Sequence, residues 1–174
     1  MTIILFAIVL SLVNPHVQET RLESLIIDRA LQCDRIRADS WHLGAPSREY
    51  IRDILRIEAM YNPPIRLKGL ILAAACHESG FNPSLTGDHK FSVRRRPRAL
   101  GILQQWIWVE HPTRGYGIDR LNPYQAVHAQ MQHLRSQLPK VRVSCGHVTT
   151  DRTWIIAQVR SVRKPPSRCI NKII

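Results

Sequence analysis

The sequence predicts a mainly α-helical fold with a small β-hairpin or irregular loop in its middle. Two patterns carry this prediction: apolar residues recur at helical spacing in both halves of the chain, and turn residues separate those stretches between residues 80 and 100. The chain has 174 residues, of which 44% are hydrophobic. That is enough for one domain with a substantial core, and a second domain of full size does not fit.

The first predicted helix begins after Ser47, whose hydroxyl is suited to capping a helix N-terminus. The apolar residues that follow at helical spacing are Tyr50, Ile51, Ile54, Leu55 and Ile57. Asn62 and the prolines after it should end this helix. A second helix should open at Pro64 and cover residues 65–79. Its body is nearly all apolar, which is typical of a central helix, and Gly80 is a natural stop for it.

Residues 82–100 should form a loop with a short hairpin. This stretch contains an Asn-Pro pair, a Gly-Asp pair and a basic run at residues 94–98. Residues 101–110 are apolar and aromatic, and they fit either a helix or a strand. The sequence therefore predicts the small β element here, between two helical parts.

Another helix should open at Asn122, with the asparagine as cap and Pro123 at the first helical position. Its inward stripe is Val127, Met131, Leu134 and Leu138. Pro139 should end it, because proline cannot donate the next backbone hydrogen bond. A last helix is expected over residues 151–163, with Trp154, Ile155 and Val159 facing inward.

The chain divides into four parts. Residues 1–14 hold an apolar run that fits either a secretory signal peptide or a short N-terminal helix, although no basic residue precedes it and no Ala-x-Ala site follows. We expect export to the periplasm or the extracellular space. Residues 15–62 should form N-terminal helices packed on the core, residues 63–138 the core itself, and residues 139–174 a basic segment that completes the domain.

The chain is strongly basic, with a formal net charge of +12. Nine basic residues lie in the segment 135–174, against the single acid Asp151. Such a field attracts polyanions, among them nucleic acid, anionic membrane and anionic wall polymers. Aromatic residues between the bases would favour nucleic acid, and this tail has only Trp154. We therefore expect no nucleic-acid partner.

The four cysteines form no C-x-x-C pair, which disfavours a zinc ribbon or a thioredoxin-type motif. Four cysteines allow three disulfide pairings. Cys76 lies in the apolar helical run, which favours a buried free thiol. Cys145 and Cys169 are the better candidate pair, since they flank the basic tail, and Cys33 is left over.

Glu78 is the most informative residue for chemistry. It lies at the end of the apolar helix, where burial and the negative end of the helix dipole both disfavour a charged carboxylate. A glutamic acid that keeps its proton near neutral pH can act as a general acid. The alternative is a glutamate that caps the helix or pairs with an arginine.

The segments around Glu78 resemble the lytic transglycosylase family. Glu78 opens the sequence Glu-Ser-Gly-Phe-Asn-Pro, residues 99–104 read Ala-Leu-Gly-Ile-Leu-Gln, and residues 117–124 end in Asn-Pro-Tyr. In this order and spacing they are similar to the family's own motifs over roughly residues 63–138. The resemblance implies a lysozyme-like domain that cleaves peptidoglycan, with Glu78 as its catalytic acid and base.

The resemblance also implies substrate-binding residues. Ser79 would hydrogen-bond the glycan near the scissile bond, Gly101 would let the sugar chain approach the backbone, and Gln104 would contact an N-acetyl group. Tyr124 belongs to the same implied set. The alternatives are a hydrogen bond at the helix end for Ser79 and a surface amide for Gln104.

The implied reaction needs one carboxyl group, whereas most glycosidases use two. Glu78 would form a 1,6-anhydro product, without metal or cofactor. Asp88, in the following loop, is the candidate second carboxylate that would make the enzyme a hydrolytic lysozyme instead. The family's Ala-Tyr-Asn-Ala-Gly segment has no counterpart here. His77 and Glu78 begin a His-Glu-x-x-His zinc pattern, but Phe81 stands at its second histidine.

Three hypotheses remain at this point: a lytic transglycosylase, a lysozyme on the same scaffold, and a non-catalytic basic protein that binds cell-wall polymer or nucleic acid. The expected partners are peptidoglycan strands and anionic wall polymers, and the expected state is a monomer. Trp106 and Trp108 fit either packing against the domain or stacking on sugar rings. His128 and His133 are five residues apart, which suits surface histidines better than metal ligands.

Overall fold

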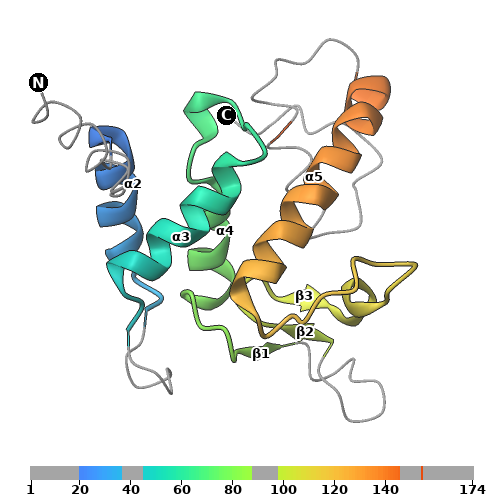
Figure 1. Ribbon diagram of the computed structural model, residues 1–174, viewed down its shortest axis with the longest axis horizontal. Coiled ribbons are helices and arrows are strands. Elements are labelled where there is room, and N and C mark those ends of the chain that lie inside the picture. The colour runs from blue at the N-terminus through green and yellow to red at the C-terminus, as the bar shows by residue number, and fades with distance from the viewer. Residues whose placement is uncertain (1–19, 37–44, 88–97, 146–153, 155–174) are drawn as a thin grey trace, which may run out of the picture.

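Figure 1 shows the computed structural model, which describes residues 20–36, 45–87, 98–145 and Trp154. These residues form a mainly helical domain, as the sequence predicted, and a small three-stranded antiparallel sheet lies where a hairpin or irregular loop was expected. The helices are α2 (Arg21–Leu31), α3 (Arg48–Ala59), α4 (Leu70–Ser79) and α5 (Pro123–Cys145), with 3₁₀ helices η2 (Ile65–Leu67) and η4 (Ile107–Glu110). The strands are β1 (Thr86–Gly87), β2 (Ala99–Leu100) and β3 (Gln105–Trp106).

One hydrophobic core joins the helices. Helix α3 packs against α2, α4 and α5, and it supplies the fully buried side chains of Ile51 and Ile54. The other fully buried aliphatic and aromatic members are Ile27, Ile71, Ala75, Phe81, Ile102, Val127 and Leu134. Residues on both sides of position 62 therefore share this core, and the N-terminal helices are part of it.

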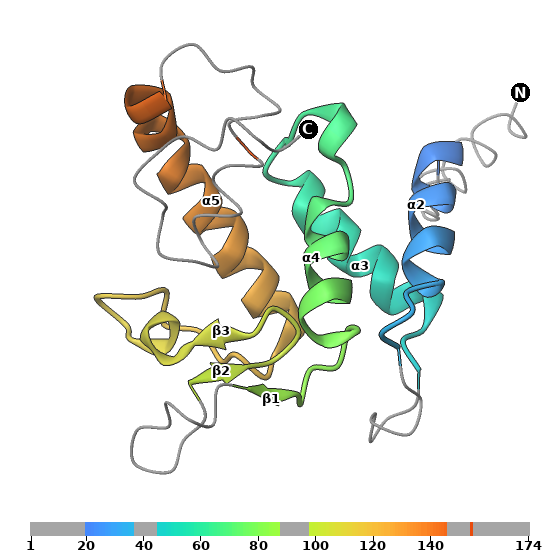
Figure 2. The same cartoon turned by 180° about the vertical axis from the view of Figure 1, so that it is seen from behind.

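The sheet lies beside the C-terminal end of α4 and the N-terminal end of α5 (Figures 1 and 2). Its strand order is β1-β2-β3, with Thr86 opposite Leu100 and Ala99 opposite Trp106. Only two residues of each strand are paired. The polypeptide that leaves α4 thus enters the sheet within a few residues, which brings the end of the buried helix next to the sheet.

The predicted helix starts at Ser47 and Asn122 are confirmed. The Ser47 hydroxyl accepts a hydrogen bond from the backbone N–H of Tyr50 at 3.1 Å. Asn122 Oδ1 accepts from the backbone N–H groups of Tyr124 and Gln125, both at 3.1 Å. These bonds satisfy amide groups that have no partner inside their own helix.

The predicted continuous helix over residues 65–79 is wrong. The 3₁₀ helix η2 ends at Leu67, and Gly69 has a left-handed backbone (φ 90°) before α4 begins. The buried carboxylate of Glu58 on α3 explains the break. It accepts the N–H of Gly69 at 2.7 Å and that of Ile71 at 3.0 Å, so it caps a new helix start.

The prediction that Pro139 ends the following helix is also wrong, because α5 continues through Pro139 to Cys145. Proline removes a single backbone donor from a helix, and the turns on either side can still form. Of the predicted last helix, Trp154 is described: it is helical and buried in the core. The rest of that helix and residues 1–14 lie outside the described residues. No helix within the described ranges is long and apolar enough to cross a membrane.

Candidate active site

Glu78 lies in the last turn of α4, next to the sheet. Its side chain is 23% exposed, so solvent reaches it while most of its surface is covered. Its carboxylate Oε1 lies 3.5 Å from Nδ1 of His77, whose own side chain is 79% exposed. Among the described residues, no other hydrogen bond or ion pair involves this carboxylate. Its oxygens are thus open to a ligand.

Ser79, the next residue, connects the end of α4 to residues 99–104, the second of the three segments in the resemblance. Its side chain is buried, and its hydroxyl lies 2.8 Å from the carbonyl oxygen of Ile102 and 3.2 Å from that of Ala75. The first contact connects the end of α4 to the turn after β2. Ser79 therefore has a structural task in addition to the substrate contact that the resemblance implies.

Gly101 and Gln104 hold the same turn against the chain that leaves α4. The N–H of Gly101 donates to the carbonyl oxygen of Leu85 at 3.0 Å, and the Gln104 amide donates to it at 2.9 Å. Gly101 has a positive φ of 80°, and a Cβ there would collide with the carbonyl oxygen of Arg120. The glycine thus allows close approach of Arg120, which comes from the third predicted segment.

Arg120 ties the third segment to the sheet. Its side chain is 3% exposed and forms an ion pair with Glu110, from Nε to Oε1 at 2.7 Å. Its Nη1 donates to the carbonyl oxygens of Arg98 at 2.8 Å and Gln105 at 2.9 Å. The planar guanidinium suits this role, because it offers several donors in fixed directions. One buried cation thereby binds the backbone just before β2 and at the first residue of β3.

Tyr124 lies at the junction of α3 and α5, where its ring packs edge-on against Tyr50 with centroids 6.2 Å apart. The Tyr50 hydroxyl lies 3.4 Å from the carbonyl oxygen of Phe81, so this pair touches the chain just after Glu78. Burial raises the pKa of Tyr50 above its ordinary value, and the neighbouring Tyr124 adds to that rise. Burial also raises the pKa of Tyr124, with the nearby acids Asp53 and Glu49 contributing. Both phenols therefore stay neutral hydrogen-bonding groups.

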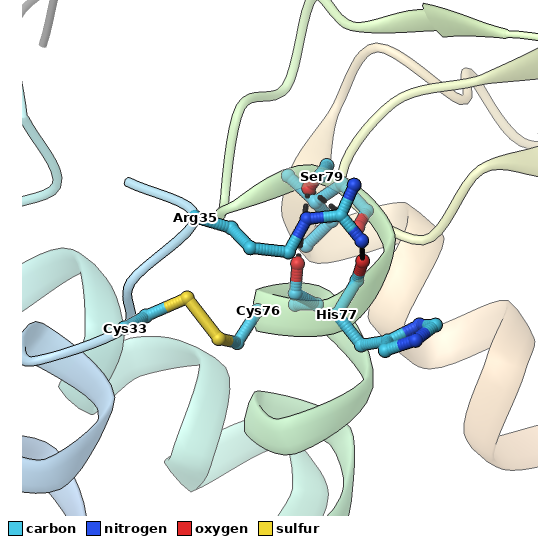
Figure 3. Close-up of a disulfide and its surroundings, with 7 residues drawn as sticks. Cys33, Arg35, Cys76, His77 and Ser79 are labelled. Atoms are coloured by element: carbon cyan, nitrogen blue, oxygen red, sulfur yellow. Dashed lines mark hydrogen bonds between the residues drawn. A yellow bond between two sulfur atoms is a disulfide. The ribbon is translucent and has the colours of Figure 1, made fainter. Parts of the chain in front are cut away.

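A disulfide between Cys33 and Cys76 anchors α4 two residues before Glu78 (Figure 3). This corrects the prediction of a free thiol at Cys76. The apolar pattern of α4 does not tell which of its faces meets the end of α2, and that contact is what brings the two sulfur atoms together. The side chains of Cys145 and Cys169 lie outside the described residues, so their pairing stays a prediction.

The segment after Cys33 also supports the turn that carries Glu78. The Arg35 guanidinium donates to the carbonyl oxygen of His77, at the electron-rich end of α4 (Figure 3). Gly80 has a positive φ of 59°, and a Cβ there would collide with the Arg35 carbonyl oxygen. Three residues around Glu78, at positions 76, 77 and 80, are thus held by one short segment that follows α2.

Other features lie apart from Glu78. A groove of about 820 Å³ lies between parts of α2 and α4. Its mainly apolar lining includes Leu25, Leu72 and Cys76 but not Glu78. Within the described part of the chain, one group of potential metal ligands is compact: Cys33, Asp34 and Cys76. Its two sulfur atoms are joined in the disulfide, so they offer no thiolate to a metal.

Asp88, the candidate second carboxylate, lies outside the described residues. No protein-family model matches the chain, and no curated protein or solved structure matches it either. What the structure shows is that the three predicted segments meet. The segment from Glu78 contacts residues 99–104 through Ser79 and Leu85. The third segment reaches the same turn through Arg120, whose carbonyl oxygen lies close to Gly101 and whose side chain donates to the residues on either side of 99–104, Arg98 and Gln105.

Sequence reasoning missed three residues at this site. Arg35 and Tyr50 lie upstream of the resembling region, where nothing in the sequence pairs them with residues 77 or 81. Arg120 lies inside the third segment, and a lone arginine between an aspartate and a leucine gives no sign of burial. The one usable signal was Cys76, because a disulfide partner upstream would have placed the end of α2 at this turn.

Proposed function

We propose that this protein is a peptidoglycan-cleaving enzyme of the lytic transglycosylase type, built on a lysozyme-like domain. The observation that carries the proposal is the junction of the three segments at the end of α4. That junction presents the carboxyl group of Glu78 beside a sheet, partly covered and with few internal partners. A site of this kind suits a general acid, which must be shielded from bulk water and still reach a ligand.

The first step is protonation of the leaving oxygen. Glu78 donates its proton to the oxygen of the β-1,4 bond between N-acetylmuramic acid and N-acetylglucosamine. The bond from that oxygen to C1 of the muramic acid then breaks, and N-acetylglucosamine leaves with a new hydroxyl. Positive charge develops on the muramic acid ring, as in other glycosidic cleavages.

The second step uses the same side chain as a base. The Glu78 carboxylate takes the proton of the muramic acid 6-hydroxyl while that oxygen bonds to C1 and closes the 1,6-anhydro ring. The proton returns to Glu78, so the acid is regenerated and no water is consumed. An attack from within the same sugar avoids the entropic cost of positioning a water molecule.

The disulfide supports an exported enzyme. Structural disulfides form and persist mainly in oxidising compartments such as the periplasm and the extracellular space. The Cys33–Cys76 bond joins the segment just after α2 to α4, two residues before the proposed acid. Peptidoglycan is found in the same compartments, which fits the proposed substrate.

The test is digestion of purified peptidoglycan by the wild-type protein and by Glu78→Gln, with the fragments analysed by mass spectrometry. Glu49→Gln is the matched control, because it makes the same change at an exposed position in the first turn of α3. We expect anhydromuropeptides from the wild type and from the control, and a loss of product of about 10²- to 10⁴-fold in Glu78→Gln.

Two other outcomes would redirect the assignment. Fragments heavier by one water, with a free reducing end, would show hydrolysis, and Asp88→Asn would then be tested as the second carboxylate. No fragments from folded wild-type protein would contradict the enzyme proposal. In that case the basic binding protein would become the leading hypothesis.

A further inference from the structure

The last turn of α4, which carries Glu78, is held from two sides. On the side of the sheet, the Ser79 hydroxyl lies 2.8 Å from the carbonyl oxygen of Ile102. On the side of α2, the disulfide between Cys33 and Cys76 joins the turn to the segment that follows α2 (Figure 3). These two attachments come from different parts of the chain, so the loss of one leaves the other in place.

The disulfide is the strongest attachment on the side of α2. Within the described part of the chain, the short segment after α2 makes one hydrogen bond to α4, from the Arg35 guanidinium to the carbonyl oxygen of His77 (Figure 3). One such bond contributes less than a disulfide that closes a long loop. The carbonyl oxygen of Cys76 also accepts the N–H of Gly80 at 3.0 Å. A shift of Cys76 therefore reaches the backbone on both sides of Glu78.

The other end of α4 has an anchor of its own. There the Glu58 carboxylate accepts the N–H of Gly69 at 2.7 Å and that of Ile71 at 3.0 Å. Cys76 lies five residues after Ile71, near the opposite end of the helix. Opening the disulfide should therefore loosen the C-terminal end of α4 and leave its N-terminal end fixed.

The disulfide can be approached from outside the core. Both of its cysteines are half-buried, and both line the groove between α2 and α4. The thiolate of a dithiol that enters this groove would attack one sulfur, form a mixed disulfide and release the first cysteine. The second thiol of the reductant would then attack the reductant's own sulfur and release the other cysteine. Two electrons and two protons thereby pass to the protein, and the reductant leaves as a disulfide.

We propose that the Cys33–Cys76 bond is a redox switch for Glu78. In the oxidised protein the bond holds the last turn of α4, and with it the carboxyl group, in place. Reduction releases the turn on the side of α2 while the core stays folded. The choice of Glu78 as the group that is switched rests on the proposed function, whereas the release of the turn does not.

Such a switch would match activity to the compartment. The cytosol keeps thiols reduced, whereas disulfides persist in oxidising compartments such as the periplasm and the extracellular space. A wall-cleaving enzyme would then stay inactive where it is synthesised. It would become active after export, once a disulfide donor had taken two electrons from its thiols.

Amide hydrogen exchange measures the release of the turn without any substrate. The protein to be measured is Cys145→Ser with Cys169→Ser, which leaves Cys33 and Cys76 as its only cysteines. The wild type is measured beside it. Each protein is compared before and after reduction with dithiothreitol, and a thiol assay shows that the bond is open.

The expected change is confined to one end of α4. The amides of Gly80 and Phe81, which donate to carbonyl groups of that helix, should exchange roughly tenfold faster after reduction. The amide of Ile71 is the control within the same helix, and that of Val127 in α5 is the control for the core. Both should exchange at the same rate in the two states.

Two results of this measurement would overturn the proposal. Unchanged exchange at Gly80 and Phe81 after complete reduction would mean that the remaining contacts fix the turn by themselves. Equal acceleration at Val127 would mean that the bond stabilises the whole domain and does not control one turn.

Digestion of peptidoglycan tests the second half of the proposal. We expect the reduced protein to release anhydromuropeptides about 10²-fold more slowly, because a small misplacement of a catalytic group has an effect of that size. Reoxidation with oxidised glutathione should restore the rate. Cys33→Ser with Cys76→Ser should be slow both with and without dithiothreitol.

The two measurements together separate the switch from the enzyme. A turn that loosens on reduction, with no cleavage in either state, would support the release of the turn and contradict the proposed enzyme. Equal cleavage by the oxidised and reduced proteins would overturn the switch and leave the proposed enzyme intact.

Discussion

The two ends of α4 each meet a glutamate, and the two carboxyl groups are held in opposite ways. Glu58 reaches the N-terminal end from α3; it is 1% exposed and accepts the N–H groups of Gly69 and Ile71. Glu78 lies at the C-terminal end, is 23% exposed, and contacts His77. The amide groups at the first end stabilise a carboxylate, whereas the carbonyl groups at the second end do not. The same residue type is therefore buried as a helix cap at one end and partly exposed at the other.

Glu78→Gln should give the largest effect. Loss of a general acid typically slows a reaction by about 10²- to 10⁴-fold, which corresponds to roughly 3–5 kcal/mol in the activation barrier. Because few contacts hold this carboxyl group, the free energy of unfolding should change by less than about 0.5 kcal/mol. Peptidoglycan digestion and urea denaturation measure the two quantities. A strongly destabilised Glu78→Gln would mean that both ends of α4 use their glutamates structurally.

Removing the disulfide should have the next largest effect, and it acts on the Glu78 end. The bond closes a loop with a sequence separation of 43 residues, so Cys33→Ser with Cys76→Ser should lower the free energy of unfolding by about 4 kcal/mol. Denaturation of the wild-type and double-serine proteins would measure this loss. Unchanged stability would show that the contacts of Arg35 and the core already fix the turn.

Glu58→Gln should destabilise the protein by about 2 kcal/mol. A glutamine can present one oxygen to Gly69 or Ile71, but its amide group would then face the other N–H donor. Glu49→Gln, on the exposed face of the same helix, should be nearly neutral. Close to its unfolding midpoint, Glu58→Gln should have a smaller folded fraction than the wild type. The activity per folded molecule should stay close to that of the wild type.

Arg35→Gln should cost about 1 kcal/mol, because it removes one charged hydrogen bond to the carbonyl oxygen of His77. Arg35→Lys keeps the positive charge at the end of α4 and should restore part of the loss. Thermal denaturation of the two variants provides the comparison. Equal midpoints for wild type and Arg35→Gln would remove Arg35 from the account of how this turn is held.

The smallest effects are pH dependences of opposite sign at two glutamates near the N-terminal end of α4. Burial raises the pKa of Glu58, against the opposing hydrogen bonds from backbone amides. The hydrogen bond from Lys68 lowers the pKa of Glu23 below its ordinary value of 4.5. As pH falls from 7 towards 4.5, folded Glu58 takes up its proton first, so wild type should gain stability relative to Glu58→Gln.

Glu23 should behave in the reverse way. Its contribution is present above pH 4.5 and is lost as pH falls through the lowered pKa, so wild type should lose its advantage over Glu23→Gln there. The partly exposed pair with Lys68 makes this advantage less than about 1 kcal/mol. Unfolding free energies of the three proteins between pH 3 and 7 test both signs, and parallel curves would contradict them.

Local signals predicted where α3 and α5 begin, and contacts between distant segments explain two of the features that were missed. The caps at Ser47 and Asn122 and the apolar spacing after them lie within a few residues, so the sequence alone revealed them. The break at Gly69 depends on a carboxylate eleven residues upstream, and the disulfide depends on a cysteine 43 residues upstream. No short-range pattern encodes either contact.

The candidate site follows the same rule. The order of the three segments predicted that they form one site, and the structure brings the segments into contact. The contacts that join them were not predictable, because they use backbone carbonyl groups: Ser79 meets that of Ile102, and Arg120 meets those of Arg98 and Gln105. Every residue has a carbonyl group, so its identity gives no indication of the partner.

Trp154 has a practical consequence for anyone preparing this protein. Its ring lies in the same core as Ile71 and Leu134, although it comes after α5 in the chain. A shortened version that stops at the end of α5 would expose the apolar surface which that ring covers and leave a vacancy of aromatic size, at a cost of about 3–5 kcal/mol. Expression boundaries should therefore keep the chain at least through Trp154.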